Sequence, residues 1–128
     1  MWLNQRTVDA IRIMTALAVA HPRLTKAALL SERTGITPLN VQKTANILVQ
    51  AGLIDAVRGP QGGLRLPREP ALLSVGEIAR AFEPEDCPVN FLSVTPAEAR
   101  ISNLMFRAHR EFFRPLESTT LADLAGAG

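Results

Sequence analysis

Residues 52–67 place two short apolar runs on either side of a glycine-rich, basic turn, and this pattern limits the folds open to the chain more than any other. Gly59, Gly62 and Gly63 allow the backbone to reverse tightly and to approach a neighbour closely. The flanking apolar residues predict two strands of a β-hairpin. A helix–turn–helix pattern lies directly upstream, and a basic hairpin after such a pair is typical of the wing of a winged helix.

Two helices are predicted first. One covers residues 5–20, with Asn4 as its N-cap, and ends before Pro22 because the residue that precedes a proline avoids the α conformation. The other covers residues 26–33, with Thr25 as its N-cap. Gly35 then supplies the positive φ that a turn needs after a helix C-terminus.

A third helix is predicted from Pro38, with Thr37 as its N-cap and Gly52 as its stop. Three residues join it to the second helix, which completes a helix–turn–helix unit. Its inner face is predicted to consist of Val41, Ala45, Leu48 and Val49.

The candidate DNA-binding residues lie on the third helix and the hairpin. Such a helix enters the major groove with its first turn leading, where amides and ammonium groups can bind base edges and phosphates. An arginine on the hairpin can enter a minor groove, and Arg58 and Arg65 flank the turn. An ordinary solvated face is the plainer alternative for each polar helical residue, so the evidence is the order of the elements. The full set is Thr37, Asn40, Gln42, Lys43, Arg58, Gly59, Gln61, Gly62, Gly63 and Arg65.

The net charge of +2 hides an uneven distribution. Residues 1–68 contain nine Lys and Arg against three Asp and Glu, a net charge of +6, whereas residues 69–128 contain five Arg against nine Asp and Glu, a net charge of −4. A basic front half suits a polyanion such as double-stranded DNA, and an acidic back half suits another kind of partner. Chance is the plainer alternative, but the basic half is also the half with the helix–turn–helix pattern.

The 128 residues suffice for one domain with an extension. Charged or amide residues interrupt every apolar run before it could span a bilayer, so no membrane partner is expected. The single cysteine, Cys87, allows no internal disulfide and fits a reducing cytoplasm. The sequence contains neither a Ser/His/Asp or Cys/His pairing nor a phosphate loop, so an enzyme is not expected.

Two capping boxes are predicted after the hairpin. Ser74 and Glu77 begin a short helix that runs to about residue 82, and Thr95 and Glu98 begin a long helix that ends near Arg114-Pro115. On the long helix, apolar residues recur at the spacing of one face, and Phe106 and Phe113 widen this stripe. The stripe can pack on its own domain or on a second subunit. We favour a dimer interface, because helix–turn–helix proteins usually bind two-fold operators as two-fold dimers. Its predicted residues are Ile101, Leu104, Met105, Ala108 and Phe112.

The chain resembles the IscR–NsrR type of bacterial winged-helix regulator, which includes CymR-like members, over nearly its whole length. The most specific match is the hairpin from Val57 to Leu66, which is close to the wing pattern Arg-Gly-x-x-Gly-Gly-x-x-Leu. Segments 74–78 and 120–124 are similar to the helix after the wing and to the segment after the long helix. The resemblance implies a homodimeric transcription factor, usually a repressor, on pseudo-palindromic DNA.

Many members of that family bind an iron–sulfur cluster through three cysteines spaced Cys-x5-Cys-x5-Cys. Cys87 stands at the first position, but Ser93 and Ala99 stand at the others, and neither can bind iron as a thiolate does. The fourth ligand is a His in some members, where this chain has Ser102, and an acid in others, where it has Val8. The comparison therefore predicts a member without the cluster, without a metal site and without another cofactor.

Three interpretations of Cys87 remain open. It can be an incidental thiol, a redox switch through a sulfenic acid or an intersubunit disulfide, or one ligand of a binding site shared between the two subunits at the dimer interface. The acidic residues Glu83, Glu85 and Asp86 oppose formation of the reactive thiolate, which weakens the redox interpretation.

We therefore predict a fold that is mainly α with a small β-hairpin. A winged helix–turn–helix domain covers residues 1–82, with the wing at 52–67; a sensor-loop remnant covers 83–94; a long dimerisation helix and a C-terminal segment cover 95–128. The predicted function is that of a cytoplasmic, sequence-specific transcriptional regulator whose partners are double-stranded DNA and a second copy of itself. A winged-helix module that binds another protein and a thiol-redox sensor that uses Cys87 are the alternatives. An unidentified small-molecule effector is left open as a further partner.

Overall fold

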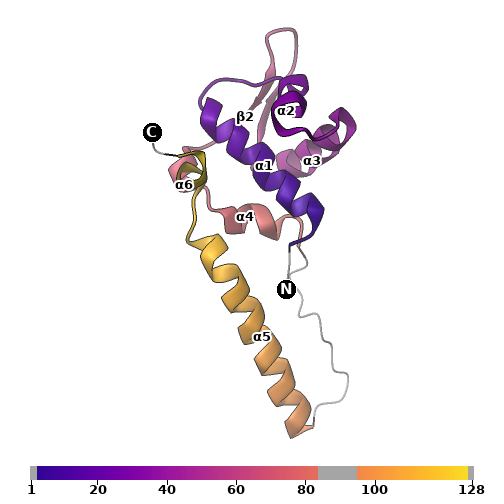
Figure 1. Cartoon of the computed structure of the whole chain (residues 1–128), viewed down its shortest axis with the longest axis vertical. Helices are drawn as coiled ribbons and strands as arrows, with labels where there is room; N and C mark the ends of the chain where they lie inside the picture. The colour runs from indigo at the N-terminus through magenta and orange to yellow at the C-terminus, as the bar shows by residue number, and fades with distance from the viewer. Residues whose placement is uncertain (1–2, 84–94, 127–128) are drawn as a thin grey trace.

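The structure is a computed structural model and describes residues 3–83 and 95–126. The predicted fold class is confirmed, because the described part is mainly helical with one two-stranded antiparallel hairpin (Figure 1). A winged domain lies at one end, and the long helix α5 leads away from it as an arm. In chain order the elements are α1 (Gln5–Ala20), α2 (Ala27–Thr34), α3 (Pro38–Gln50), β1 (Asp55–Val57), β2 (Gly63–Arg65), η1 (Pro70–Leu72), α4 (Val75–Arg80), α5 (Pro96–Glu117) and α6 (Leu121–Ala125).

Helix α1 forms the centre of the winged domain. Asn4 caps it, as predicted, by accepting a hydrogen bond of 2.9 Å from the backbone N–H of Thr7. Ile13, Met14 and Leu17 are fully buried, and α2, α3, α4, α6 and β2 all pack against this helix. Helix α3 and the wing are therefore held on the same central helix, whereas the long helix α5 packs on α4.

The helix–turn–helix unit forms as predicted, with Gly35 at φ 75° and Thr37 as the N-cap of α3. The N-cap of α2 was predicted wrongly. Lys26 occupies that position, while Thr25 is buried and pairs through its backbone with Leu64 of β2. This long-range pairing fixes Thr25 in an extended conformation and moves the start of the helix by one residue.

The inner face of α3 also differs from the prediction at one place. Val41, Ala45 and Leu48 are buried as expected, but Val49 is exposed and Thr44 is buried in its place. Both residues satisfy a helical spacing, and only the packing against the rest of the domain decides between them.

The wing follows after Gly52, which has φ 76° and ends the turn after α3. Strands β1 and β2 pair antiparallel, with Asp55 opposite Arg65 and Val57 opposite Gly63. At Gly62 an added Cβ would lie 2.0 Å from the carbonyl oxygen of Val57, so no other residue fits this turn.

Both capping boxes are confirmed at the starts of α4 and α5. The long helix ends slightly later than predicted, because α5 continues through Pro115 to Glu117. Proline lacks an N–H, but residues after it can still donate backward, and Ser118 donates to the carbonyl of Arg114 at 3.1 Å. No helix in residues 3–83 and 95–126 combines the length and apolar composition needed to cross a membrane.

The chain returns to the winged domain after α5. Ser74 and Thr120 form an antiparallel bridge, and Leu121 of α6 is fully buried in the core beside Leu73. Hydrogen bonds from the backbone and side chain of Thr120 lower the pKa of Asp123 below its ordinary value. The segment after the long helix thus closes the domain that the first helix begins.

Candidate nucleic-acid interface

Helix α3 presents a polar outer face. Because Val41, Thr44, Ala45 and Leu48 are buried, the opposite side of the helix carries Leu39, Lys43 and Asn46. Lys43 and its predicted companions Asn40 and Gln42 are all exposed. Leu39 was not predicted as a contact, yet it is 60% exposed in the first turn of the helix. An exposed leucine in that position is suited to the methyl group of a thymine, and its signal in the sequence is its place opposite the buried positions.

Thr37 stands at the start of this face. Its hydroxyl oxygen accepts a hydrogen bond of 3.3 Å from the backbone N–H of Asn40. The hydroxyl proton can still be donated to a phosphate oxygen beside the positive end of the helix.

A groove of about 400 Å³ runs between α3 and the start of α1. Asn40 and Lys43 line it from α3, and Gln5, Arg6 and Asp9 line it from α1. The guanidinium of Arg6 lies over the ring of Phe82, 5.7 Å from its centre, which holds this side chain against the domain.

The tip of the wing is a tight turn from Gly59 to Gly62, closed by a hydrogen bond of 3.0 Å from the N–H of Gly62 to the carbonyl of Gly59. Arg58 and Gln61 at this tip are exposed, whereas Gly62 is buried. An added Cβ at Gly63 would lie 2.9 Å from the carbonyl oxygen of Thr25. These two glycines therefore allow a close approach to the protein's own backbone, at Val57 for Gly62 and at Thr25 for Gly63.

Arg65 lies at the end of β2 that is away from the tip. It is directly opposite Asp55 on the neighbouring strand, and its Nε is 3.5 Å from a carboxylate oxygen of that residue. This pairing places Arg65 at the base of the wing with part of its charge already neutralised. Arg58 and Arg65 lie on either side of the turn, but only Arg58 lies at its tip.

Most basic side chains in the winged domain have partners within the protein. Arg12 donates to the carbonyl of Thr34, Arg23 donates to that of Ala20, and Arg68 pairs with Glu77. Within residues 3–83 and 95–126, three cations of this domain have no such hydrogen bond, ion pair or ring contact: Arg33, Lys43 and Arg58. They belong to α2, α3 and the wing, which are the three parts of a winged-helix reader. Arg33 was not predicted, because its solvated state follows only from the contacts of its neighbours.

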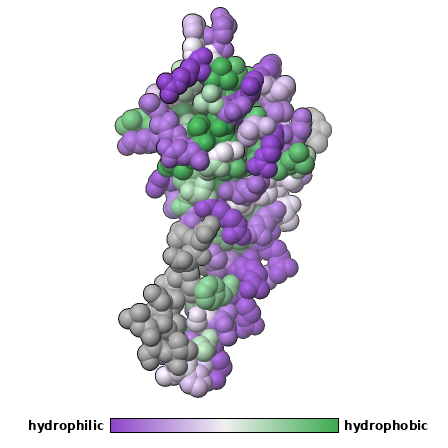
Figure 2. All heavy atoms as spheres, turned by 180° about the vertical axis from the view of Figure 1, so that it is seen from behind, coloured by the Kyte–Doolittle hydropathy of each residue, from purple (hydrophilic) through white to green (hydrophobic). Residues whose placement is uncertain are grey.

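The predicted stripe on α5 is largely solvent-accessible. Ile101 is 43% and Leu104 51% exposed, Ala108 is exposed, and Met105 and Phe112 are half-buried. Phe113 does not widen this stripe as predicted, because it is buried against the winged domain, where Arg80 lies 5.3 Å from its ring centre. Figure 2 shows apolar atoms on the arm as well as on the winged domain.

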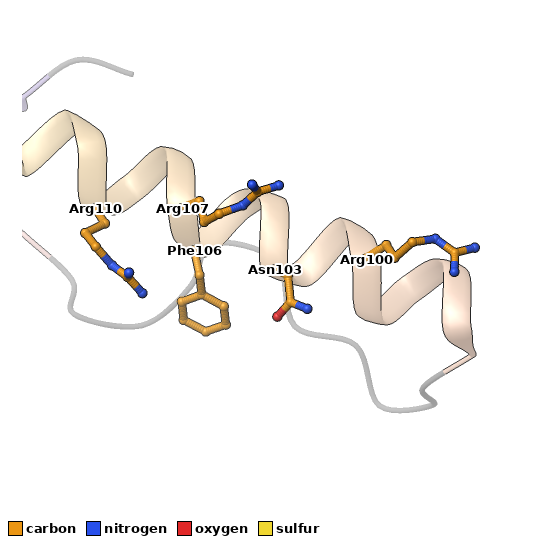
Figure 3. Close-up of a pocket in the computed structure, with 5 residues that line it drawn as sticks. All are labelled: Arg100, Asn103, Phe106, Arg107 and Arg110. Atoms are coloured by element: carbon orange, nitrogen blue, oxygen red, sulfur yellow. The ribbon is translucent and has the colours of Figure 1, made fainter.

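The opposite flank of α5 is basic. Arg100, Arg107 and Arg110 line an open hollow of about 560 Å³ together with Asn103 and Phe106 (Figure 3). Phe106 and Asn103 project to the same side of the helix, and Phe106 is 47% exposed. The acidic balance of residues 69–128 therefore does not extend to this helix face.

Residues 3–127 match the Rrf2 family, whose members are described as iron-dependent transcriptional regulators. The chain belongs to the Rrf2 family. It is accordingly a DNA-binding transcriptional regulator, as the wing, the helix pair and the resemblance to IscR-type proteins predicted.

Solved structures agree with this assignment. CymR, the global cysteine regulator of B. subtilis, is 28% identical with a TM-score of 0.78, over 98% of this chain and 96% of its own. IscR of T. potens is 26% identical with a TM-score of 0.78, over 97% of this chain and 85% of its own. The oxidized form of Staphylococcus aureus CymR is 26% identical with a TM-score of 0.74, over all of this chain and 98% of its own.

The described residues do not fit an iron–sulfur cluster. The third cysteine position is Ala99 on α5, followed by Ser102, and neither supplies a thiolate or an imidazole. Asp9, next to Val8, accepts a hydrogen bond of 2.9 Å from Gln5 and pairs with Arg12. Residues 3–83 and 95–126 contain no group of three or more His, Cys, Asp or Glu that could hold a metal ion. Cys87 and Ser93 lie outside the described residues.

The free and paired arginines of the wing should behave differently on DNA. We expect Arg58→Ala to weaken binding and to lower the slope of log K against log salt by about 0.9, the effect of losing one phosphate contact. Arg65→Ala should lower the slope less, because Asp55 already neutralises part of its charge. Fluorescence anisotropy titrations at several salt concentrations measure both. Equal losses of slope would show that the ion pair opens on DNA.

Proposed function

We propose that this chain is a cytoplasmic, homodimeric repressor that binds a pseudo-palindromic operator without an iron–sulfur cluster. The observation that carries the proposal is the arrangement of three cations on α2, α3 and the wing that have no partner among the described residues. Unpaired cations can release counterions from DNA without first breaking an internal contact, so these positions contribute most to affinity. A bacterial setting fits the named relatives.

Each part of the reader has a separate task in this proposal. Asn40, Gln42 and Lys43 contact base edges and phosphates in the major groove, with Leu39 beside them, and Thr37 binds a phosphate. Arg58 enters the neighbouring minor groove, with Gly59 and Gln61 at the backbone. Gly62 and Gly63 shape the wing by their close approach to neighbouring backbone, and Arg65 supports it from its base.

A titration of a labelled duplex from the region upstream of the gene tests the proposal. We expect tight binding that weakens steeply with salt, and much weaker binding to a duplex of scrambled sequence. Equal affinity for the two sequences across the whole upstream region would reject a sequence-specific regulator. Binding that survives Arg58→Glu would favour the alternative, a winged-helix module that reads another protein.

The second copy packs on the exposed stripe of α5. Side chains such as Ile101 and Leu104 leave apolar surface in water, and covering such surface is favourable by about 25 cal/mol per Å². The helix that carries them projects from the winged domain, so two such arms can meet without a clash between the readers (Figure 1). A two-fold pair then presents two wings and two α3 helices to the two half-sites of an operator.

Leu104→Glu should dissociate this dimer, because a buried carboxylate without a partner costs several kcal/mol. Analytical ultracentrifugation gives the subunit number. Leu104 is exposed in the single chain, so the variant should still fold, which circular dichroism checks. Asn103→Glu, next to it on the basic flank, is the matched control and should remain dimeric. A dimeric Leu104→Glu protein would show that the interface lies elsewhere.

The signal to this regulator is proposed to act through residues 83–94 as a remnant of the sensor loop. Glu83 connects the start of this segment to the reader, because its carboxylate accepts 2.7 Å and 3.0 Å hydrogen bonds from the Thr7 hydroxyl and the Asn4 N–H. A change in the segment can therefore reach α1 and the groove beside α3. Either a small-molecule effector or oxidation of Cys87 is the candidate stimulus.

The absence of a cluster is tested by absorption spectra of protein purified without oxygen. We expect no visible absorption band and no stoichiometric iron, since the chain has one cysteine where the cluster needs three. Reconstitution of Cys87→Ser protein with iron and sulfide is the control. A band in the parent protein that the variant lacks would overturn the proposal and make Cys87 a ligand.

A further inference from the structure

The wing is attached to the start of α2 by contacts outside the hairpin itself. Thr25 and Leu64 exchange two backbone hydrogen bonds, of 2.8 Å and 2.9 Å. The next residue, Lys26, extends its side chain to the turn, where its Nζ donates to the carbonyl oxygen of Pro60 at 2.7 Å and lies 3.4 Å from that of Gly59. A hairpin with three residues per strand is marginal alone, so these outside contacts matter for its position.

The identity of Lys26 runs against the local preference of its position. It is the N-cap of α2, where Ser, Thr, Asp or Asn would supply a hydrogen-bond acceptor, and it makes no cap hydrogen bond. A cation at this end of a helix is also disfavoured by the helix dipole. The two carbonyls of the wing turn are the partners that compensate for this placement.

The orientation of these two carbonyls is coupled to that of the side chains at the wing tip. The peptide units of Gly59 and Pro60 lie between Arg58 and Gln61, the two exposed polar side chains at the tip. The Gly59 carbonyl is also the acceptor that closes the turn with Gly62. Rotation of these peptide units would move both side chains, so a bond that holds them also holds the tip.

We propose that Lys26 is a positioning residue of the DNA reader, which fixes the wing tip against α2 and does not itself bind a phosphate. This inference rests on the proposed function for its consequence, but the bond that it invokes belongs to the free protein. Its two acceptors are neutral carbonyls, so Lys26 keeps its own positive charge, and what the contact adds is the geometry of the tip.

The chain offers a matched pair of variants, because it contains two lysines, Lys26 and Lys43. Lys→Met keeps an unbranched side chain and removes the donors. We expect Lys26→Met to weaken operator binding roughly fivefold, the equivalent of one hydrogen bond of about 1 kcal/mol. Its salt slope should fall by much less than about 0.9, because the charge that it removes makes no phosphate contact. Lys43→Met should instead lower the slope by about 0.9. Lys26→Arg should restore most of the affinity, because a guanidinium can donate to the same carbonyls.

Hydrogen exchange of the Gly62 amide in the free protein is the second measurement. Lys26→Met should accelerate it and Lys43→Met should not. A salt slope that falls by about 0.9 in Lys26→Met would identify a phosphate contact and overturn the proposal. Unchanged affinity or unchanged exchange in that variant would also overturn it. If the parent protein binds no duplex, the proposed function fails, and the exchange result still decides whether Lys26 holds the turn.

Discussion

Burial of α1 is the constraint on which the rest of the structure depends. Ile13, Met14 and Leu17 have no exposed surface, and burying side chains of this size stabilises the fold by about 1.5–3 kcal/mol each. Five other elements pack on the same helix, so hydrophobic contact sets where α3 and the wing stand relative to each other. The wing tip lies beyond this core, and there polar contacts such as that of Lys26 decide the finer position.

The distribution of partners among the basic residues explains how a small net charge can serve a polyanion. Counting charges identifies the basic half of the chain but treats its nine cations alike. Several of them bond carbonyls, carboxylates or rings, whereas Arg33, Lys43 and Arg58 make no such contact within residues 3–83 and 95–126. A cation without an internal partner breaks no contact within the protein when it binds a phosphate. A few such cations on the DNA-facing elements can therefore matter more for DNA binding than the total number of basic residues.

Helix α5 presents an apolar surface and a basic surface in different directions, although their residues alternate along the sequence. The apolar stripe is suited to a second copy, and the basic flank with Phe106 faces another direction. The family is described as iron-dependent, yet Ala99 and Ser102 occupy ligand positions on this helix. The winged domain of the family is thus present, while Ala99 and Ser102 supply neither a thiolate nor an imidazole for a cluster.

The sequence by itself determined the local structure: the N-caps at Asn4 and Thr37, the turns at Gly35 and Gly52, and both capping boxes, because each depends on residues within one or two helical turns. Tertiary structure alone decided the rest. Thr25 pairs with a distant strand, Phe113 packs on its own domain, Arg65 meets Asp55, and Leu121 enters the first helix's core. These outcomes depend on which surfaces meet after the chain folds, and no local spacing records that.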